Sequence, residues 1–132
     1  NFEKTAFVRK ETECLAKNIY YEAGATSDEG MRAVAQVTMN RKRAHFAKTI
    51  CGVVYQKSGK TCQFSWVCNQ TKQVYVPAYK KAYDIAKNSL IKGMASAKLK
   101  SALYFHADYS NPSWKEQKTY VAQIGPHIFY AE

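Results

Sequence analysis

The sequence predicts an α+β domain that is mainly helical, with a small antiparallel β-hairpin or sheet near its C-terminus. Three segments before residue 94 repeat apolar side chains at helical spacing, and two short segments after residue 101 alternate as strands do. With 132 residues, the chain is long enough to bury a core without help from metals or disulfides. We therefore expect a single domain that spans residues 1–132.

The segment 14–25 contains the first predicted helix, which places one acid within an apolar pattern and is expected to end in the segment 24–27. Leu15 and Ile19 fall on one face, and Glu22 falls beside Leu15 at the edge of that face. A carboxyl group held there is partly desolvated, which raises its pKa and lets it donate a proton near neutral pH. Glu22 is therefore the candidate catalytic acid, and the alternative is an ordinary surface glutamate. The preceding residues are expected to form a short helix or a frayed arm.

A second helix is predicted to begin after Ser27, which is a favourable N-cap, and to end near residue 43. Polar residues recur along it at spacings of three and four, which predicts a core helix with one solvent-exposed stripe. Two members of this stripe, Gln36 and Asn40, are alternatively part of a substrate-binding wall. The stripe comprises Glu29, Arg32, Gln36, Asn40 and Arg43.

The chain between residues 44 and 76 is irregular, apart from a short helix or turn expected at 51–56. A third helix follows, because Pro77 suits the first turn of a helix and Gly93 suits its end. Its apolar residues repeat on one side while lysines and other polar residues occupy the other, so this helix is expected to be structural.

Within the irregular region, residues 62–68 form an aromatic, hydrogen-bonding segment flanked by two cysteines. A long loop inside a compact domain is usually functional, so Gln63 and Ser65 are candidate substrate-binding residues. In the alternative interpretation, a disulfide pins the loop, and Phe64 and Trp66 fill the core.

Residues 102–107 and 119–124 are predicted to be two antiparallel strands that pair through a turn at 111–114. This hairpin would display aromatic rings near a cleft, where rings stack well on sugar or base faces. The apolar residues 124–130 are expected to pack back on the helices. The displayed side chains are Tyr104, His106, Trp114 and Tyr120, of which the first three are candidate substrate-binding residues.

The chain carries 20 basic and 10 acidic residues, and its net charge of +10 favours contact with polyanions. Nucleic acid, anionic lipid and acidic cell-wall polymers all qualify. No run of 18 apolar residues predicts a membrane span, and no signal segment opens the chain. Its start at Asn1 suggests a processed or truncated product.

Four cysteines permit two disulfides in an oxidising compartment, with three possible pairings. A zinc site is the rival interpretation. It is disfavoured because the sequence has no C-x-x-C pair and its three histidines are scattered. No metal or cofactor is therefore expected.

Six motifs follow one another along residues 14–130. In order and content they resemble the SleB-type cell wall hydrolases, a family named for a spore cortex-lytic enzyme. The motifs are Leu15-Ala-x-Asn-Ile-Tyr-Tyr-Glu22-Ala, Gly30-x-x-Ala-Val-Ala-Gln-Val-x-x-Asn-Arg41, Cys51-Gly-Val-Val-Tyr-Gln56, Cys62-Gln-Phe-Ser-Trp66, Tyr104-x-His106 with Pro112-x-Trp114, and Ile124-Gly-x-His-x-Phe-Tyr130.

The resemblance implies a lysozyme-like α+β domain that cuts the glycan strands of peptidoglycan, with Glu22 as general acid. The family commonly has a second acid where this chain has Thr26, so that acid is not expected to be essential. Of the other carboxylates, only Asp108 is plausibly placed near the cleft. A single acid favours a lytic transglycosylase, in which the sugar's own 6-hydroxyl attacks, over a hydrolysing muramidase.

The expected partner is therefore the peptidoglycan glycan strand, bound by a monomer that touches the anionic cell envelope transiently. The expected location is periplasmic or extracellular, and a phage-encoded enzyme delivered to the host periplasm fits the same interpretation. Two rivals are a non-catalytic wall-binding module and a basic nucleic-acid-binding module. The second lacks any recognition motif, so no nucleic acid is expected as a partner.

Overall fold

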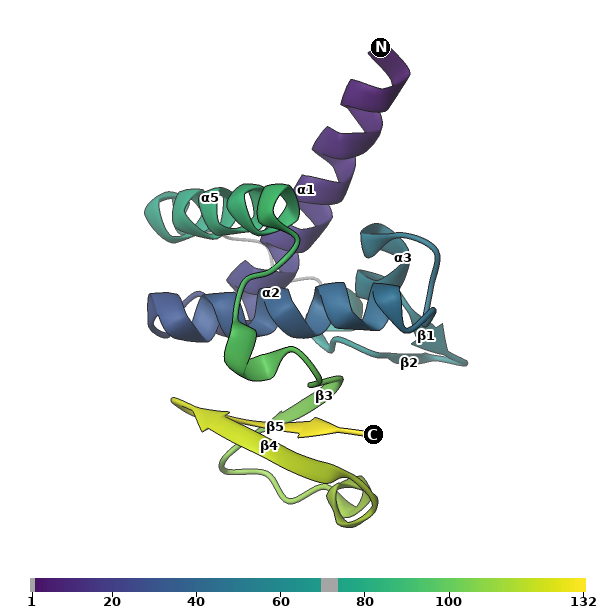
Figure 1. The fold of residues 1–132 in the computed structure, drawn as a ribbon, viewed down its shortest axis with the longest axis vertical. Helices are drawn as coiled ribbons and strands as arrows, with labels where there is room; N and C mark the ends of the chain where they lie inside the picture. Colours follow the sequence, from purple (N-terminus) through teal and green to yellow (C-terminus); the bar gives the residue numbers. More distant parts are fainter. Residues whose placement is uncertain (1, 70–73) are drawn as a thin grey trace.

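Helices form one part of the molecule and a small antiparallel sheet forms the other (Figure 1), which confirms the predicted α+β class. The computed structural model describes residues 2–69 and 74–132, so the predicted irregular region is described except at 70–73. The helix α2 (Asp28–Arg43) runs between α5 (Val76–Lys92) and the sheet, and α1 (Phe2–Ala23) crosses both helices. The other elements are α3 (Ile50–Val54), β1 (Lys57–Ser58), β2 (Thr61–Cys62), α4 (Trp66–Asn69), the 3-10 helices η1 (Ala97–Leu99) and η2 (Ser113–Gln117), and the strands β3 (Tyr104–Ala107), β4 (Thr119–Ile124) and β5 (His127–Ala131).

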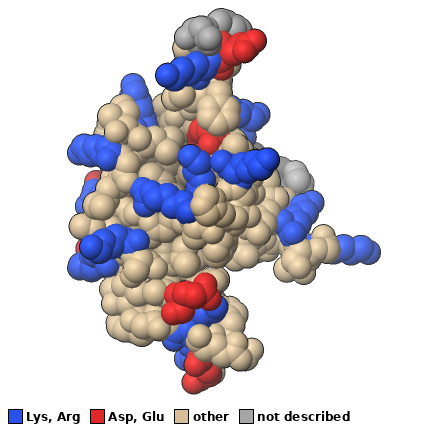
Figure 2. All heavy atoms as spheres, turned by 45° about the vertical axis from the view of Figure 1, so that its right-hand side comes forward, with Lys and Arg blue, Asp and Glu red and all other residues tan. Residues whose placement is uncertain are grey.

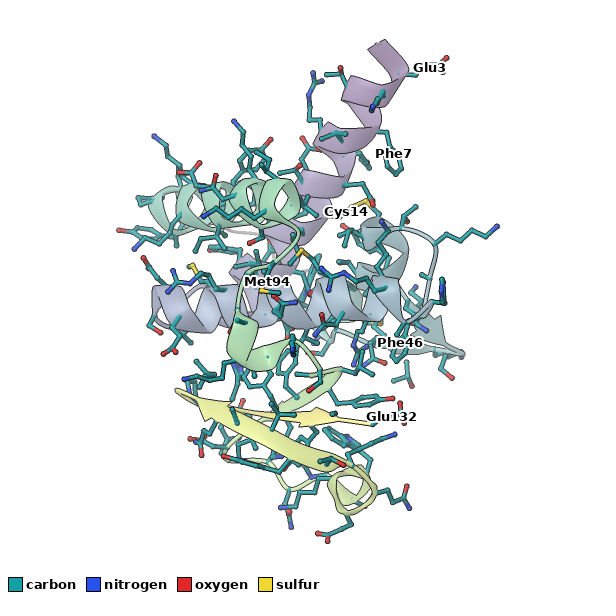
Figure 3. The ribbon with its side chains drawn as sticks, viewed as in Figure 1. Glu3, Phe7, Cys14, Phe46, Met94 and Glu132 are labelled. Atoms are coloured by element: carbon teal, nitrogen blue, oxygen red, sulfur yellow. A yellow bond between two sulfur atoms is a disulfide. The ribbon has the colours of Figure 1, made fainter. Side chains whose placement is uncertain are left out.

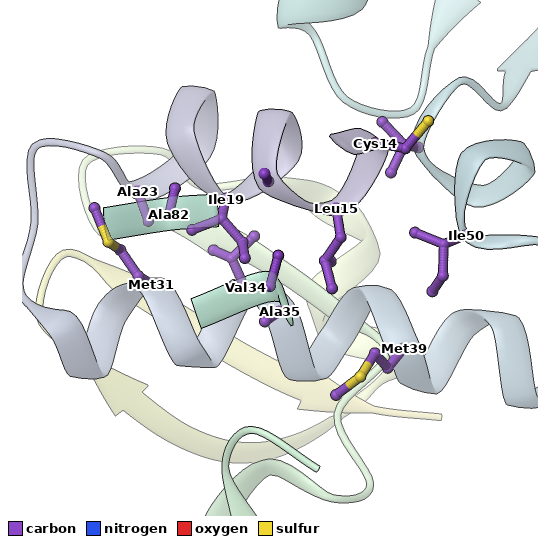
Figure 4. Close-up of a cluster of buried hydrophobic side chains, with 13 residues drawn as sticks. Cys14, Leu15, Ile19, Ala23, Met31, Val34, Ala35, Met39, Ile50 and Ala82 are labelled. Carbon is purple, nitrogen blue, oxygen red and sulfur yellow. The ribbon is translucent and has the colours of Figure 1, made fainter. Parts of the chain in front are cut away.

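The helix α1 is continuous, so residues 2–13 extend it and form neither a separate helix nor an arm. Its first half projects from the rest of the molecule (Figure 1). Its second half buries Leu15 and Ile19 against α2, in the core shown in Figure 4. The helix ends at Ala23, as predicted, and the next amide, that of Gly24, donates to the carbonyl of Tyr20 at 2.8 Å.

The start of α2 is as predicted, because the Ser27 hydroxyl accepts a hydrogen bond from the amide of Gly30 at 3.1 Å. Asp28 and Glu29 occupy the first turn, where the helix dipole favours negative charge. The α5 boundaries are also confirmed. Pro77 lies in its first turn, and Gly93 ends it with a φ of 74°, a conformation that favours glycine.

The predicted solvent-exposed stripe of α2 is wrong at its centre, because Gln36 and Asn40 are buried. The Gln36 carboxamide oxygen accepts hydrogen bonds from the amide of Ala95 and from the next amide, at 2.7 and 2.8 Å. The Asn40 carboxamide nitrogen donates to the carbonyls of Leu99 and Ala102, at 2.9 and 2.8 Å. These two side chains therefore make hydrogen bonds to the backbone of the segment that connects α5 to β3. They form neither an exposed surface nor a substrate-binding wall.

The strands pair differently from the prediction. Residues 102–107 and 119–124 do not pair with each other, because β5 lies between them and the strand order is β3-β5-β4. The tight hairpin joins β4 to β5 through Gly125, whose φ is 55°. The expectation that the last apolar residues pack on the helices is correct for Phe129. Its fully buried ring belongs to a cluster that includes Val37 of α2.

Two disulfides form, and each joins cysteines that follow one another in the order of the four: Cys14 with Cys51, and Cys62 with Cys68. The first ties α3 to α1, and the buried Glu11 carboxylate strengthens the same junction. It accepts hydrogen bonds from the first two amides of α3, at 2.8 and 3.0 Å.

We expect loss of the Cys14–Cys51 disulfide to destabilise the protein more than loss of Cys62–Cys68. The two bonds span sequence separations of 37 and 6 residues, and chain entropy then gives contributions of about 4 and about 2 kcal/mol. Urea unfolding of the two double Cys→Ala variants measures both losses. Equal losses would contradict the prediction.

None of the helices in the described part of the chain is long and apolar enough to cross a membrane. Within the same residues, no group of three or more histidine, cysteine or acidic side chains is arranged to hold a metal ion.

Candidate active site

A cleft lies between the helices and the sheet and consists of two adjoining cavities of about 300 and about 420 Å³. The smaller cavity contains Glu22, and the larger one extends toward η2. Arg41, Gln63, Phe105 and His106 line both cavities, so the cleft is continuous. The helices α1 and α2 and the loop after β2 supply one wall, and β3 and β5 supply the other.

Glu22 lies in the last turn of α1 and is half-buried. Burial raises the pKa of its carboxyl from 4.5 to about 7, and the positive charge of Arg41 opposes this rise. This is the partly desolvated position that the helical pattern predicts for Glu22. A large fraction of the carboxyl therefore stays protonated near neutral pH, as a general acid requires.

Arg41 is a residue of the cleft that the sequence analysis did not single out. Its Nε donates to the carbonyl of Leu103 at 2.7 Å. Its guanidinium carbon lies 5.3 to 5.5 Å from the ring centres of Phe46, Phe64 and Tyr104. Burial lowers the pKa of Arg41 to about 10, so the side chain is still charged at neutral pH.

The signal for Arg41 is present in the sequence. It follows Val34 by seven residues and Val37 by four, so the helical pattern puts a charged residue on the apolar face of α2. A cation at such a position requires partners, and here the aromatic rings and a backbone carbonyl provide them.

The loop after β2 contributes to both the cleft and the core. The core-filling interpretation holds for Phe64, and substrate binding by Gln63 and Ser65 stays a prediction. Gln63 faces Arg41, and its carboxamide oxygen accepts from both terminal guanidinium nitrogens at 3.2 Å in the amide orientation that satisfies both groups. Ser65 lines the smaller cavity. Phe64 is buried, and the indole of Trp66 donates to the Asn18 side chain at 2.9 Å.

The three candidates on the sheet side, Tyr104, His106 and Trp114, lie together along the larger cavity. Tyr104 contacts the ring of Phe46 at a centroid distance of 6.2 Å, and its hydroxyl donates to Glu132 at 2.9 Å. Figure 3 shows Phe46 and Glu132 on the same side of the molecule.

Both ring nitrogens of His106 are occupied within the protein. Nδ1 lies 2.7 Å from the carbonyl of Ala107, which can only accept, so Nδ1 carries the proton. Nε2 then accepts from the hydroxyl of Tyr130 at 3.0 Å. His106 therefore orders this wall of the cleft and has no ring nitrogen left for a ligand. Tyr120 is 61% exposed and lines neither cavity.

The unpredicted residues of the smaller cavity include Tyr21, Tyr109 and His127. Tyr21 stacks on Trp66 at a centroid distance of 4.6 Å. Tyr109 is 90% exposed at the edge of the cleft. His127 is buried at the start of β5. In the sequence, the one signal for His127 is its place in the motif that spans residues 124–130.

Glu22 is the only carboxylate among the described residues that line the cleft. Asp108, the other candidate, is exposed and lies between two lining residues, Ala107 and Tyr109, without lining the cleft itself. Asp28 and Glu29 are exposed at the start of α2, where they pair with lysines.

Basic residues outnumber acidic ones by 20 to 10 in the sequence. Figure 2 shows lysine and arginine spread over the helical part of one face, with fewer acids, several of them near the end formed by the sheet. This distribution agrees with the net charge of +10. It favours association with anionic polymers.

A half-buried acid at the end of a helix, facing a cleft closed by a small sheet, defines a lysozyme-like domain. Residues 25–130 match the family model of the cell wall hydrolases, and the chain belongs to this family. The matched span begins after Glu22, so the role of this residue is argued from the geometry of the cleft.

Two relatives support this assignment. The catalytic domain of the germination-specific lytic transglycosylase SleB from Bacillus anthracis superposes with a TM-score of 0.72, at 27% identity over 91% of this chain and 93% of that one. The spore cortex-lytic enzyme of Oceanobacillus iheyensis is 27% identical over 124 residues. That alignment covers 93% of this chain but only 42% of the relative, so this chain matches less than half of the curated protein.

Proposed function

We propose that this chain is a lytic transglycosylase that cleaves the β-1,4 bond between N-acetylmuramic acid and N-acetylglucosamine in peptidoglycan. The observation that carries the proposal is that a single acidic side chain, in the described part of the chain, lines the cleft. Glu22 is the single carboxylate among the described lining residues, and burial raises its pKa to about 7. Membership of the cell wall hydrolase family supports peptidoglycan as the substrate.

In the proposed reaction, protonated Glu22 donates its proton to the glycosidic oxygen, and the bond from that oxygen to the muramic C1 breaks. The 4-hydroxyl of the N-acetylglucosamine leaves with that proton. The muramic 6-hydroxyl then forms a bond to C1 and gives its proton to the Glu22 carboxylate. The acid is thus restored and no water is consumed, so one enzyme group serves both steps.

Arg41 supports the same cycle through its charge. While Glu22 is a carboxylate, the guanidinium stabilises it, because opposite charges attract strongly in a partly desolvated site. The hydrogen bonds of Arg41 to Gln63 and Leu103 keep this charge in place. Ser65, Tyr104 and Trp114 remain the candidates for contact with the glycan, and Tyr109 is added as an exposed ring on which a sugar can stack.

We further infer that residues 1–132 act as one catalytic domain, and that this domain is monomeric and works outside the cytoplasm, in the periplasm or at the cell wall. Two disulfides suit an oxidising compartment. The basic surface suits transient contact with an anionic envelope. A phage-encoded enzyme that reaches the host periplasm is one setting with these properties.

We expect digestion of purified sacculi to release muropeptides with 1,6-anhydromuramic ends. Mass spectrometry distinguishes them, because ring closure in place of water attack makes each product lighter by about 18 mass units. The Asp108→Asn variant is expected to give the same products at nearly the wild-type rate. Reducing ends, together with loss of activity in Asp108→Asn, would instead indicate a hydrolysing muramidase. Binding to sacculi without any release would indicate a wall-binding module.

A further inference from the structure

His127 is a buried polar side chain of the cleft that the proposed reaction does not use. It is 9% exposed and lines the smaller cavity together with Glu22. The backbone at His127 pairs with β3 at Ala107 and with β4 at Ile124, so the central strand holds the residue from both sides. Its ring packs edge-on against Phe105, which also lines the cavity, at a centroid distance of 5.1 Å.

The two ring nitrogens of His127 have different surroundings. Nδ1 is buried and has no hydrogen-bond partner among the described residues. Because an orphaned buried N–H is rarer and less tolerated than an unpaired acceptor, the proton belongs on Nε2. A doubly protonated ring would place an N–H at Nδ1, where it would have no acceptor among the described residues, so the charged form is disfavoured as well. Burial lowers the pKa of His127, against the opposing charge of Asp108, which agrees with a neutral ring.

The neutral ring therefore offers one donor, Nε2–H. Because Nδ1 is enclosed while the side chain lines the cavity, we infer that Nε2 is the nitrogen that can reach a ligand there. His106 differs in this respect, because the protein occupies both of its nitrogens. Beside the His127 donor lies the apolar ring of Phe105. The cavity thus presents a donor next to an apolar surface, on the wall opposite Glu22.

We propose that His127 recognises the acetamido group of the sugar that is seated against Glu22. Its Nε2–H donates to the acetamido carbonyl oxygen, which can only accept, and the acetamido methyl packs on Phe105. A hydroxyl group would satisfy the donor but would leave the apolar ring without a partner. This inference rests on the proposed function, because it assumes an N-acetylated glycan in this cleft. It assigns His127 as the residue that selects for N-acetylation.

The test uses two variants of similar size. His127→Gln can place an amide N–H near the position of Nε2, whereas His127→Asn can place one only near Nδ1. We expect wild type and His127→Gln to cleave N-acetylated glycan about tenfold more efficiently than the same glycan after chemical de-N-acetylation. In His127→Asn this preference falls to about twofold, through a higher KM on the N-acetylated substrate. Thermal unfolding checks that both variants are folded.

Two readouts separate failure of this inference from failure of the proposed function. Nitrogen-15 NMR of the wild-type imidazole reports the tautomer without any activity, and a proton on Nδ1 would overturn the inference. Binding of a soluble peptidoglycan tetrasaccharide is measured in the Glu22→Gln background. There, His127→Asn is expected to weaken affinity about tenfold and His127→Gln to preserve it. An active wild type whose N-acetyl preference survives in His127→Asn would refute the role of His127 alone.

Discussion

Replacing Glu22 with glutamine is expected to lower the turnover of peptidoglycan by about 10³-fold, with the fold intact. Glutamine keeps the shape of the side chain but cannot transfer a proton, and no second carboxylate among the described lining residues can replace it. Release of muropeptides from sacculi measures the loss. Glu29→Gln, an exposed change of the same chemistry at the start of α2, is the matched control and should cleave at the wild-type rate.

The same variant carries a second expectation, which concerns stability. Since the Glu22 pKa is about 7 in the folded chain and near 4.5 when unfolded, the folded chain holds more protons between these values. The contribution of Glu22 to stability is therefore fully present below pH 4.5 and is lost as the pH rises through about 7. The difference between the two pKa values corresponds to roughly 3 kcal/mol.

Glu22→Gln lacks this dependence, so it should match the wild type near pH 4 and be more stable by up to roughly 3 kcal/mol at pH 8. Urea unfolding at both pH values checks the sign. A constant difference between the two proteins from pH 4 to pH 8 would mean that the carboxyl is not desolvated. In that case, desolvation could not explain how Glu22 acts as an acid near neutral pH.

The second large effect is expected at Asn40. Asn40→Asp replaces the nitrogen that donates to the carbonyls of Leu99 and Ala102 with an oxygen, so both acceptors lose their partner and face negative charge. Each buried group left unpaired costs about 1 to 3 kcal/mol, so we expect a loss of about 4 kcal/mol. For a chain of this length, the melting temperature should fall by about 14 °C.

Asn88→Asp on α5 is the matched control, because Asn88 is exposed and the chemical change is the same. Calorimetry of both variants at pH 7 measures the difference. A melting temperature for Asn40→Asp within about 3 °C of the wild type would show that the two hydrogen bonds do not hold the connection to β3.

Local patterns were sufficient to predict several features. Helical spacing put Glu22 at the edge of a buried face, and Pro77 with Gly93 predicted the ends of α5, because these signals depend only on near neighbours in the chain. The even number of cysteines also predicted disulfides, although their pairing stayed open until the structure brought Cys14 beside Cys51.

Features that depend on distant segments were not predictable in this way. A polar stripe on α2 looks the same whether water or a distant backbone satisfies it, so the burial of Gln36 and Asn40 was missed. Strand pairing is likewise non-local, and alternation identified a strand at 119–124 without showing that β5 separates it from β3. Arg41 and His127 line one cavity only because the fold brings α2 and β5 together.

The two walls of the cleft are both built on α2. Leu15 and Ile19, on the helix that carries Glu22, pack in one cluster with α2, and Ile124 and Phe129 of the sheet pack in a second cluster with the same helix. Phe105 contacts both clusters. A hinge motion that closed the cleft would have to repack two interiors at once, and close-packed interiors resist such changes. We therefore expect the cleft to keep its shape in the free protein, so that the proposed glycan substrate would bind without a large rearrangement of either wall.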